Sequence, residues 1–246
     1  MARTLVLFAH PALEKSRVHR RLTRDLPALV ARTPGLTFRD LYETYPDFDV
    51  DVEAEQRLLE SHDLVVLQHP FYWYSAPALV KQWFDLVLEH GWAYGSRGRA
   101  LEGKRVLSVV TLGGSAGAYC RGGYNRFTVR ELLAPIEQTA RLCRMTYLPP
   151  YAVFGTHHLD DAGVAAEADR YARLLAAFAA DRVAWPVDDV GPLECAPGGG
   201  APGPAPGTRL LTAPDVDALL AAANDGAGAP AADGAGPALA AAGGAP

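Results

Sequence analysis

The feature that most limits the fold of this chain is the stretch from Leu64 to Pro77, in which four successive apolar residues run into an aromatic cluster and then a proline. An uninterrupted apolar run is typical of a central strand in a parallel sheet, buried on both faces. Pro77 suits the first turn of a following helix, where its missing N–H costs nothing. Residues 71–74 therefore lie on the connection after the strand.

This connection consists of four large aromatic residues in succession, Phe71, Tyr72, Trp73 and Tyr74. They cannot all point into the core, so we expect some of them to line a cleft at the carboxyl end of the strand. Open α/β sheets bind their ligands in such clefts. The alternative is a hydrophobic plug that only packs beneath the loop.

The composition changes near Trp185 and divides the chain into a domain over 1–185 and a tail over 186–246. In the tail, 40 of 61 residues are Ala, Gly or Pro and none is aromatic. Such a segment buries too little apolar surface to offset its ordering entropy, so we expect a disordered tail. Residues 215–224 have the pattern of a short helix that is marginal without a partner.

The charge divides in the same way. The tail carries seven acidic residues and one arginine, a net of -6, while the whole chain has a formal net charge of -5. About +1 is left on the domain, so no basic surplus favours a nucleic-acid partner.

Cysteine and histidine usage argues against disulfides and metals. The 3 cysteines are too few and too scattered for a disulfide framework, and the 7 histidines show no metal-ligand spacing. No stretch approaches the 18 or so apolar residues of a membrane span. We therefore expect a soluble protein of the reducing cytoplasm with no metal site.

The order of apolar runs predicts the architecture. Five strands are expected, at 3–9, 36–41, 64–68, 105–111 and 146–154, the last interrupted at Pro149 and Pro150. Helices are expected at 16–29 with a kink at Pro27, and at 52–59, 77–89, 128–143 and 163–181, with a loop at 42–51. This alternation predicts an α/β domain with a flavodoxin-like, doubly wound, five-stranded parallel sheet of order 2-1-3-4-5 and helices on both faces.

In this topology the ligand crevice is bordered by the loops at 10–16, 69–75 and 112–123. The first loop leads into a helix N-terminus, whose unpaired N–H groups and dipole favour an anion such as phosphate. The hydroxyl of Ser16 could add a donor there, or serve only as an ordinary helix cap.

Two short motifs suggest hydrolysis instead. Residues 98–104 nearly repeat a phosphate-binding P-loop, but Arg105 replaces the Ser or Thr, and the segment precedes a strand. Residues 113–117 fit the G-x-S-x-G elbow of a serine acyl hydrolase, with Ser115 as nucleophile and His157 or His158 as base. Further glycines continue to Gly123 where the elbow requires a helix, so the acyl hydrolase remains a minor alternative.

Several motifs together resemble one family, the flavodoxin-like NAD(P)H:quinone oxidoreductases, and especially the ancillary subunit of glutathione-regulated potassium-efflux systems. The resemblance covers about residues 3–182. It is carried by Phe8-Ala9-His10-Pro11, Leu41-Tyr42-x-x-Tyr45-Pro46-Asp47-Phe48, Gln68-His69-Pro70-x-x-Trp73-Tyr74-Ser75-x-Pro77, His90-Gly91-Trp92-Ala93-Tyr94-Gly95 and Thr111-x-Gly113-Gly114.

The resemblance implies a bound flavin, FMN in the efflux-subunit branch, with FAD as the alternative and NAD(P)H as electron donor. Residues 71–74 would flank the flavin ring, and residues 111–114 would donate backbone N–H groups toward its N1/O2 end. Leu112 replaces a threonine of the family, which removes one hydroxyl. The phosphate would lie near His10, Ser16, Arg17, Val18 and His19.

The resemblance also implies catalytic positions at Tyr119 and Asn125. Asn125 replaces a histidine and cannot relay a proton as histidine does. The hypothesis is a ping-pong oxidoreductase that passes a hydride from NAD(P)H through the flavin to a quinone, with Trp92 and Tyr94 forming part of the substrate pocket.

Two kinds of protein partner are expected, a second copy of the chain and a membrane antiporter. Trp92 and Tyr94 are expected to be exposed on a connection, and they predict a homodimer whose pockets are completed across the interface. They could instead fold back onto their own sheet. The resemblance further implies a regulatory alternative, in which the protein docks on a potassium/proton antiporter at the inner face of the membrane.

Overall fold

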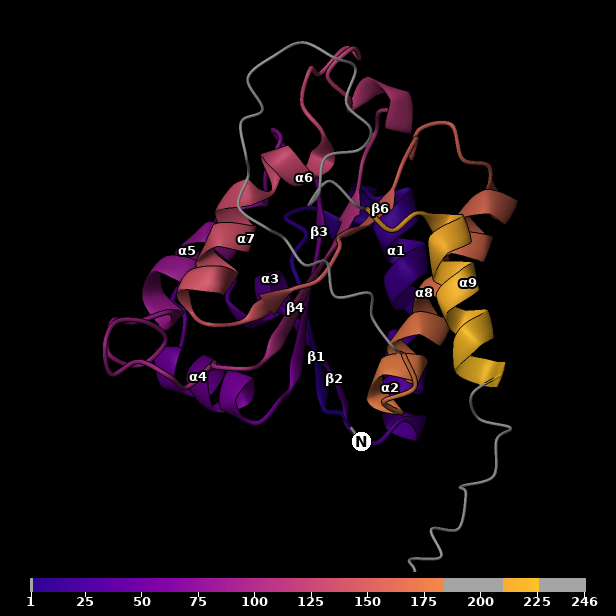
Figure 1. Ribbon diagram of the computed structural model, residues 1–246. Helices are drawn as coiled ribbons and strands as arrows, with labels where there is room; N and C mark the ends of the chain where they lie inside the picture. Colours follow the sequence, from indigo (N-terminus) through magenta and orange to yellow (C-terminus); the bar gives the residue numbers. More distant parts are fainter. Residues whose placement is uncertain (1, 184–209, 226–246) are drawn as a thin grey trace, which may run out of the picture.

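The structure is a computed structural model that describes residues 2–183 and 210–225. A parallel sheet runs through its centre, with strand order β2-β1-β3-β4-β5 and with β6 also paired to β4 (Figure 1). The flavodoxin-like order is therefore confirmed. The strands are β1 Thr4–Phe8, β2 Leu36–Asp40, β3 Leu64–Pro70, β4 Arg105–Thr111, β5 Thr146–Tyr147 and β6 Tyr151–Val153.

The last predicted strand is divided, as its prolines suggested. β5 pairs with the first residues of β4 and β6 with the last ones. Between them lie Pro149 and Pro150, which have no N–H to donate to a neighbouring strand. Together β5 and β6 occupy the fifth position of the sheet.

Helices cover both faces of the sheet (Figure 1). One face carries the helices α1 Arg17–Arg24, α2 Leu26–Arg32, α8 Asp161–Ala179 and α9 Ala213–Asp225. The other carries α3 Leu41–Thr44, α4 Val52–Glu60, α5 Ala78–Val87, α6 Val129–Leu132 and α7 Ala134–Leu142. Two short 3-10 turns, Leu13–Lys15 and Ala116–Ala118, lie in the loops after β1 and β4.

The central strand β3 separates two hydrophobic cores. All seven of its residues are buried, as the apolar run predicted. Val66 belongs to the core beneath α1 and α8, while Leu67 belongs to the core beneath α4, α5 and α7. The polar Gln68 is buried with them, and its side-chain oxygen accepts a hydrogen bond from Tyr171 of α8, at 2.9 Å.

Local sequence explains where several helices begin and break. The side chain of Ser16 caps α1 by accepting a hydrogen bond from the N–H of His19. The kink expected at Pro27 is a full break between α1 and α2. The helix predicted over 128–143 is also broken, at Leu133, and Pro135 sits in the first turn of α7. The loop predicted over 42–51 begins with the short helix α3, which Asp40 caps.

The expectation of a disordered tail is wrong for residues 210–225. Helix α9 lies along α8 (Figure 1), and Leu211 forms a parallel bridge with Tyr151 at the edge of the sheet. Val216 and Leu220 are buried, and Asp217 makes two 3.0 Å hydrogen bonds with Arg170. A helix that is marginal alone is stable here because it has a partner surface. The rest of the predicted tail lies outside the described residues.

Candidate functional site

The three loops predicted to border a crevice meet at the carboxyl end of the sheet. Tyr72, after β3, places its hydroxyl 3.5 Å from Nε2 of His10, after β1. Thr111, at the end of β4, places its hydroxyl 2.8 Å from Nε2 of His19 on α1. These contacts join segments that are 62 and 92 residues apart in the sequence.

The first loop and the start of α1 form the candidate anion site. The first-turn N–H groups of Arg17 and Val18 have no partner within the helix. His10 shapes the loop by accepting a hydrogen bond from the N–H of Ala12 through Nδ1, at 3.1 Å. The side chain of Val18 is buried in the core, so this residue offers the site only its backbone N–H.

Three buried histidines lie beneath this loop. Burial lowers the pKa of His10, lowers that of His19 further, and lowers that of His69 to about 4. All three are therefore neutral at pH 7. The rings of His10 and His19 are 5.1 Å apart, and Nδ1 of His19 is buried with no hydrogen-bond partner among the described residues.

Arg17 does not face the candidate anion site with its side chain. Its guanidinium reaches the loop after β6, where it bonds Asp161 and two backbone carbonyls. The predicted phosphate contact of Arg17 is thus limited in this structure to its backbone N–H.

The aromatic loop is exposed except at its first residue. Phe71 is buried, whereas Tyr72 is 44% exposed, Trp73 93% and Tyr74 47%. The idea of a hydrophobic plug therefore applies to Phe71 alone. Trp73 and Tyr74 have positive φ angles of 49° and 62°, an uncommon conformation for bulky residues that often marks functional sites.

The glycine loop after β4 supplies the opposite wall. The carbonyls of Leu112 and Gly114 accept hydrogen bonds from the N–H groups of Thr156 and Gly155, at 3.0 and 2.9 Å. The N–H of Leu112 donates to the carbonyl of Val153, at 2.8 Å, so the expectation that Leu112 offers its N–H to a flavin is wrong. The N–H groups of Gly113 and Gly114 make no such backbone bond among the described residues and are the candidate donors. A side chain at Gly113 would meet the ring of His157, because its Cβ would lie 2.7 Å from Nε2.

Sequence reasoning missed this fourth wall, the loop at 154–158. It follows β6 at the same edge of the sheet as the other three loops, and Gly155 has a positive φ of 64°. The signal was available, because every loop after a parallel strand reaches the carboxyl edge. The prolines within the fifth strand obscured the position at which that strand ends.

Tyr119 lies between the aromatic loop and the end of β6. Its ring is 6.0 Å from that of Phe71 and 6.1 Å from that of Phe154. Burial raises the pKa of its hydroxyl, which therefore stays protonated at neutral pH. Asn125 accepts a hydrogen bond from the hydroxyl of Tyr74, at 3.3 Å, and so connects the glycine loop to the aromatic loop.

The nucleophile elbow is not assembled. Ser115 is exposed and precedes a three-residue 3-10 turn instead of a helix. Among the described residues, no hydrogen bond joins its hydroxyl to His157 or His158. The P-loop-like segment precedes β4, as its sequence context suggested.

Trp92 and Tyr94 lie away from the crevice of their own chain. Both are half-buried against the core beneath α5, so the expectation that they are exposed is wrong. The indole N–H of Trp92 donates to Glu60, at 2.9 Å, near the amino end of β3. Tyr94 instead lines a groove of about 520 Å³ between α5 and α7.

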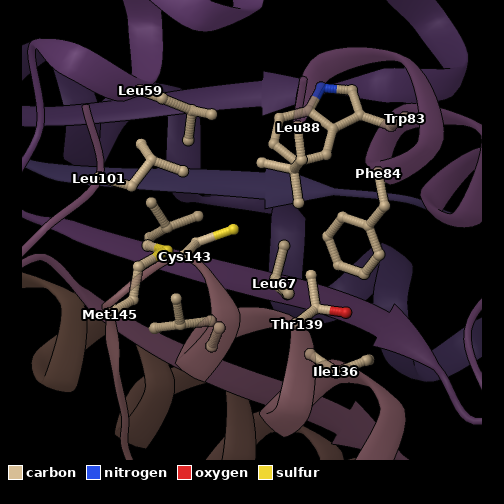
Figure 2. Close-up of a pocket in the computed structure, with 13 residues that line it drawn as sticks. Leu59, Leu67, Trp83, Phe84, Leu88, Leu101, Ile136, Thr139, Cys143 and Met145 are labelled. Atoms are coloured by element: carbon tan, nitrogen blue, oxygen red, sulfur yellow. The ribbon is translucent and has the colours of Figure 1, made fainter. Parts of the chain in front are cut away.

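A second cavity, of about 30 Å³, lies behind this groove (Figure 2). Leu67, Trp83, Leu101 and Cys143 contribute to its almost entirely apolar lining. It has no converging polar groups and is a packing defect of the core, not a reaction site. Within residues 2–183 and 210–225, no acidic, histidine or cysteine side chains are grouped as metal ligands, and no helix is long and apolar enough to cross a membrane.

A family model described as the flavodoxin-like fold matches residues 2–175. The chain belongs to this family. Its relatives include general stress protein 14 of Bacillus subtilis, 42% identical over 171 residues that cover 70% of this chain and 95% of the relative. Another is the potassium-efflux ancillary protein KefF of Klebsiella aerogenes, 43% identical over 70% of this chain and 93% of the relative.

Solved structures extend this similarity. General stress protein 14 of Treponema denticola, in complex with FMN, superposes with a TM-score of 0.64 at 38% identity and covers 73% of this chain and 98% of its own. An NADPH-quinone reductase from P. pentosaceus has a TM-score of 0.61 at 34% identity, over 72% and 97%. Helix α9 lies beyond the residues that the family model matches.

Proposed function

We propose that this protein is an FMN-dependent NAD(P)H:quinone oxidoreductase. The observation that carries the proposal is the crevice itself, in which a helix N-terminus, a glycine loop and an aromatic wall meet at one edge of the sheet. The family shares this fold with a protein solved with FMN and with an NADPH-quinone reductase.

The residues present fit FMN. The first-turn N–H groups of α1 and the Ser16 hydroxyl suit the phosphate, and so does Nδ1 of His19, which has no partner among the residues that the structure describes. The glycines at 113 and 114 leave the backbone of this wall uncovered, as the close approach of a flat ring requires. Neither position has room for a side chain, because an added Cβ would lie 2.7 Å from the ring of His157 or 3.1 Å from that of Tyr119. The exposed rings of residues 72–74 provide a stacking wall.

When bound, FMN supplies the hydride chemistry, accepting from NAD(P)H and donating to a quinone in a ping-pong cycle. The chain contributes binding and electrostatics. The amide N–H groups of Gly113 and Gly114 would stabilise negative charge on the N1/O2 edge. The protonated hydroxyl of Tyr119 would donate a hydrogen bond to the quinone oxygen as charge develops there.

Anaerobic mixing tests this function. Excess NADPH or NADH should bleach the visible absorbance of the FMN-loaded protein, and added quinone should restore it. Tyr119→Phe should lower kcat with quinone by about tenfold, the effect of one hydrogen bond, while the reduction of the flavin by NAD(P)H stays unchanged. An FMN-loaded protein that NAD(P)H cannot reduce would contradict the proposal.

A homodimer is part of the same proposal. The groove between α5 and α7 is open and more apolar than polar, and exposed Leu142 and half-buried Tyr94 lie along it. A second copy of the chain would cover these side chains, which a monomer leaves in water. Sedimentation at micromolar concentration should show a dimer, and Leu142→Glu should shift it to monomer. A monomeric wild-type protein would contradict this part.

Partnership with a potassium/proton antiporter is the second candidate function. It is supported by relatives named as ancillary proteins of potassium-efflux systems, such as the KefF protein of Klebsiella aerogenes. Such a partner would place the protein in the cytoplasm, at the inner face of the membrane. Co-purification with an antiporter encoded in the same genome tests this role, and steady quinone turnover without any partner would favour an independent enzyme.

A further inference from the structure

The side chain of Arg17 crosses from the phosphate loop to the loop after β6, the fourth wall of the crevice. Its Nη2 donates to the carbonyl of Thr156, at 3.3 Å, and also to that of Leu159. Its Nη1 lies 3.1 Å from a carboxylate oxygen of Asp161. These partners are 139 to 144 residues away in the sequence, so one guanidinium joins the start of α1 to the loop between β6 and α8.

The loop that Arg17 holds is the loop that supports the glycine wall. The N–H of Thr156 donates to the carbonyl of Leu112, at 3.0 Å, and the neighbouring N–H of Gly155 donates to Gly114, at 2.9 Å. The ring of His157 lies against Gly113. A continuous chain of contacts therefore runs from Arg17 through Thr156 to the donors of the glycine loop.

The hydrogen bonds from Arg17 to the two carbonyls hold the loop more firmly than the ion pair with Asp161 does. The side chain of Asp161 is 98% exposed and that of Arg17 is 46% exposed, and ion pairs of this kind contribute little. A planar guanidinium can bond several oxygens at fixed angles, which a lysine ammonium on a flexible stem does not reproduce.

We infer that Arg17 is a positioning residue that sets the distance between the two ends of the flavin site, the phosphate end at α1 and the ring end at residues 112–114. It acts through Thr156 and does not neutralise the phosphate with its side chain. The inference rests on the proposed function to the extent that a flavin is the ligand. It gives Arg17 a role different from the phosphate contact that the family resemblance implied.

The lysine variant separates the two roles, because Arg17→Lys keeps the positive charge and loses the planar fork. The measurement is the dissociation constant of FMN and of riboflavin, which has no phosphate, by flavin fluorescence at 20 °C. A positioning role predicts that Arg17→Lys weakens both ligands by the same factor, about tenfold, the effect of one charge-assisted hydrogen bond. The midpoint potential of bound FMN should also become more negative, because the N1/O2 donors are less well placed.

Two variants serve as controls. Asp161→Asn removes the ion pair and keeps the carbonyl contacts, so both affinities should stay near those of the wild type. Arg20→Lys alters a neighbouring arginine of α1, whose guanidinium donates to the carbonyl of Glu14, at 3.4 Å. It should also leave both flavin affinities near those of the wild type. Circular dichroism of each variant shows whether it is folded at the assay temperature, and Arg17→Gln replaces Arg17→Lys if the latter is unfolded.

The outcomes are distinct. If Arg17→Lys keeps both affinities, or if Arg17→Gln weakens FMN and leaves riboflavin unchanged, Arg17 acts as a charge on the phosphate and the positioning role is overturned. The proposed function survives either result. If the wild-type protein binds neither FMN nor riboflavin, the proposed function fails first, and the inference fails with it.

Discussion

Substitution of Leu220 by alanine tests the docking of α9, the part of the fold that the sequence pattern predicted least well. Leu220 is 6% exposed and lies one turn from fully buried Val216 on the face that meets α8. Burial of a leucine side chain contributes about 1.5–3 kcal/mol, and replacement by alanine in cores costs about 2–5 kcal/mol. A terminal helix can shift to close part of the gap, so we expect a loss of about 2 kcal/mol.

Hydrogen exchange measured by mass spectrometry reads this loss directly. A change of about 2 kcal/mol raises the open fraction of a segment about thirtyfold, so peptides that cover α9 should exchange about thirtyfold faster in Leu220→Ala. The matched control is Ala221→Ser, an exposed neighbour whose exchange should change little. Wild-type α9 peptides that exchange at the rate of an unfolded chain would refute the docking.

Three further predictions follow from buried groups and from the glycine loop. Glu55 is fully buried and accepts hydrogen bonds from Arg39, Tyr45 and Trp83. Glu55→Ala should therefore lower the free energy of unfolding by about 3–5 kcal/mol and Tm by roughly 10 °C. The control Glu53→Ala, at an exposed position of the same helix, should change neither quantity. A thermal melt of Glu55→Ala within 2 °C or so of the wild type would contradict this. The pKa of His69 is about 4 in the folded chain against an ordinary 6.5, so between these pH values the unfolded chain binds more protons than the folded chain. The free energy of unfolding should therefore fall as the pH is lowered from 6.5 to 4, by up to about 1.4 kcal/mol per pH unit. The fall should be less steep in His69→Asn. Denaturant titrations across this range measure it, and equal slopes for the two proteins would count against a buried neutral His69. A Cβ at Gly123 would lie 2.4 Å from the carbonyl oxygen of Gly117, whereas one at Gly122 meets no atom of the described residues within 4 Å. Gly123→Ala should therefore displace the loop that carries Tyr119 and lower quinone turnover, and Gly122→Ala should not. Equal turnover in these two variants would show that the loop geometry is unimportant.

The sheet and its crevice could be predicted because they depend on patterns that are local in the sequence. The apolar runs that became β1, β3 and β4 are buried along their length, and strand order then determines which loops meet. His10, Ser16, Tyr72 and Gly113 lie at this edge for that reason. Their roles toward a flavin remain proposals.

The docking of α9 could not be predicted from composition. A count of alanine, glycine and proline averages over the segment, whereas the helix depends on one face formed by Val216, Leu220 and Ala223. That face is stable only because α8 offers a complementary surface, with Arg170 opposite Asp217. Complementarity between segments so far apart is not visible in either segment alone.

Arg17 and Trp92 show a different limit. The family resemblance implied a phosphate contact for Arg17, and the position of Trp92 on a connection predicted an interface. The structure gives each a partner on another element, the carbonyls of loop 156–161 for Arg17 and Glu60 for Trp92. Long side chains reach partners that only the folded backbone brings near.

Titration of purified, dialysed protein with FMN shows directly whether the crevice holds this cofactor. We expect saturable quenching of flavin fluorescence at one FMN per chain, with a shift in the visible absorbance bands and a lower affinity for riboflavin, which lacks the phosphate that α1 would bind. A protein that shows no saturable binding of FMN or FAD would contradict the proposed function.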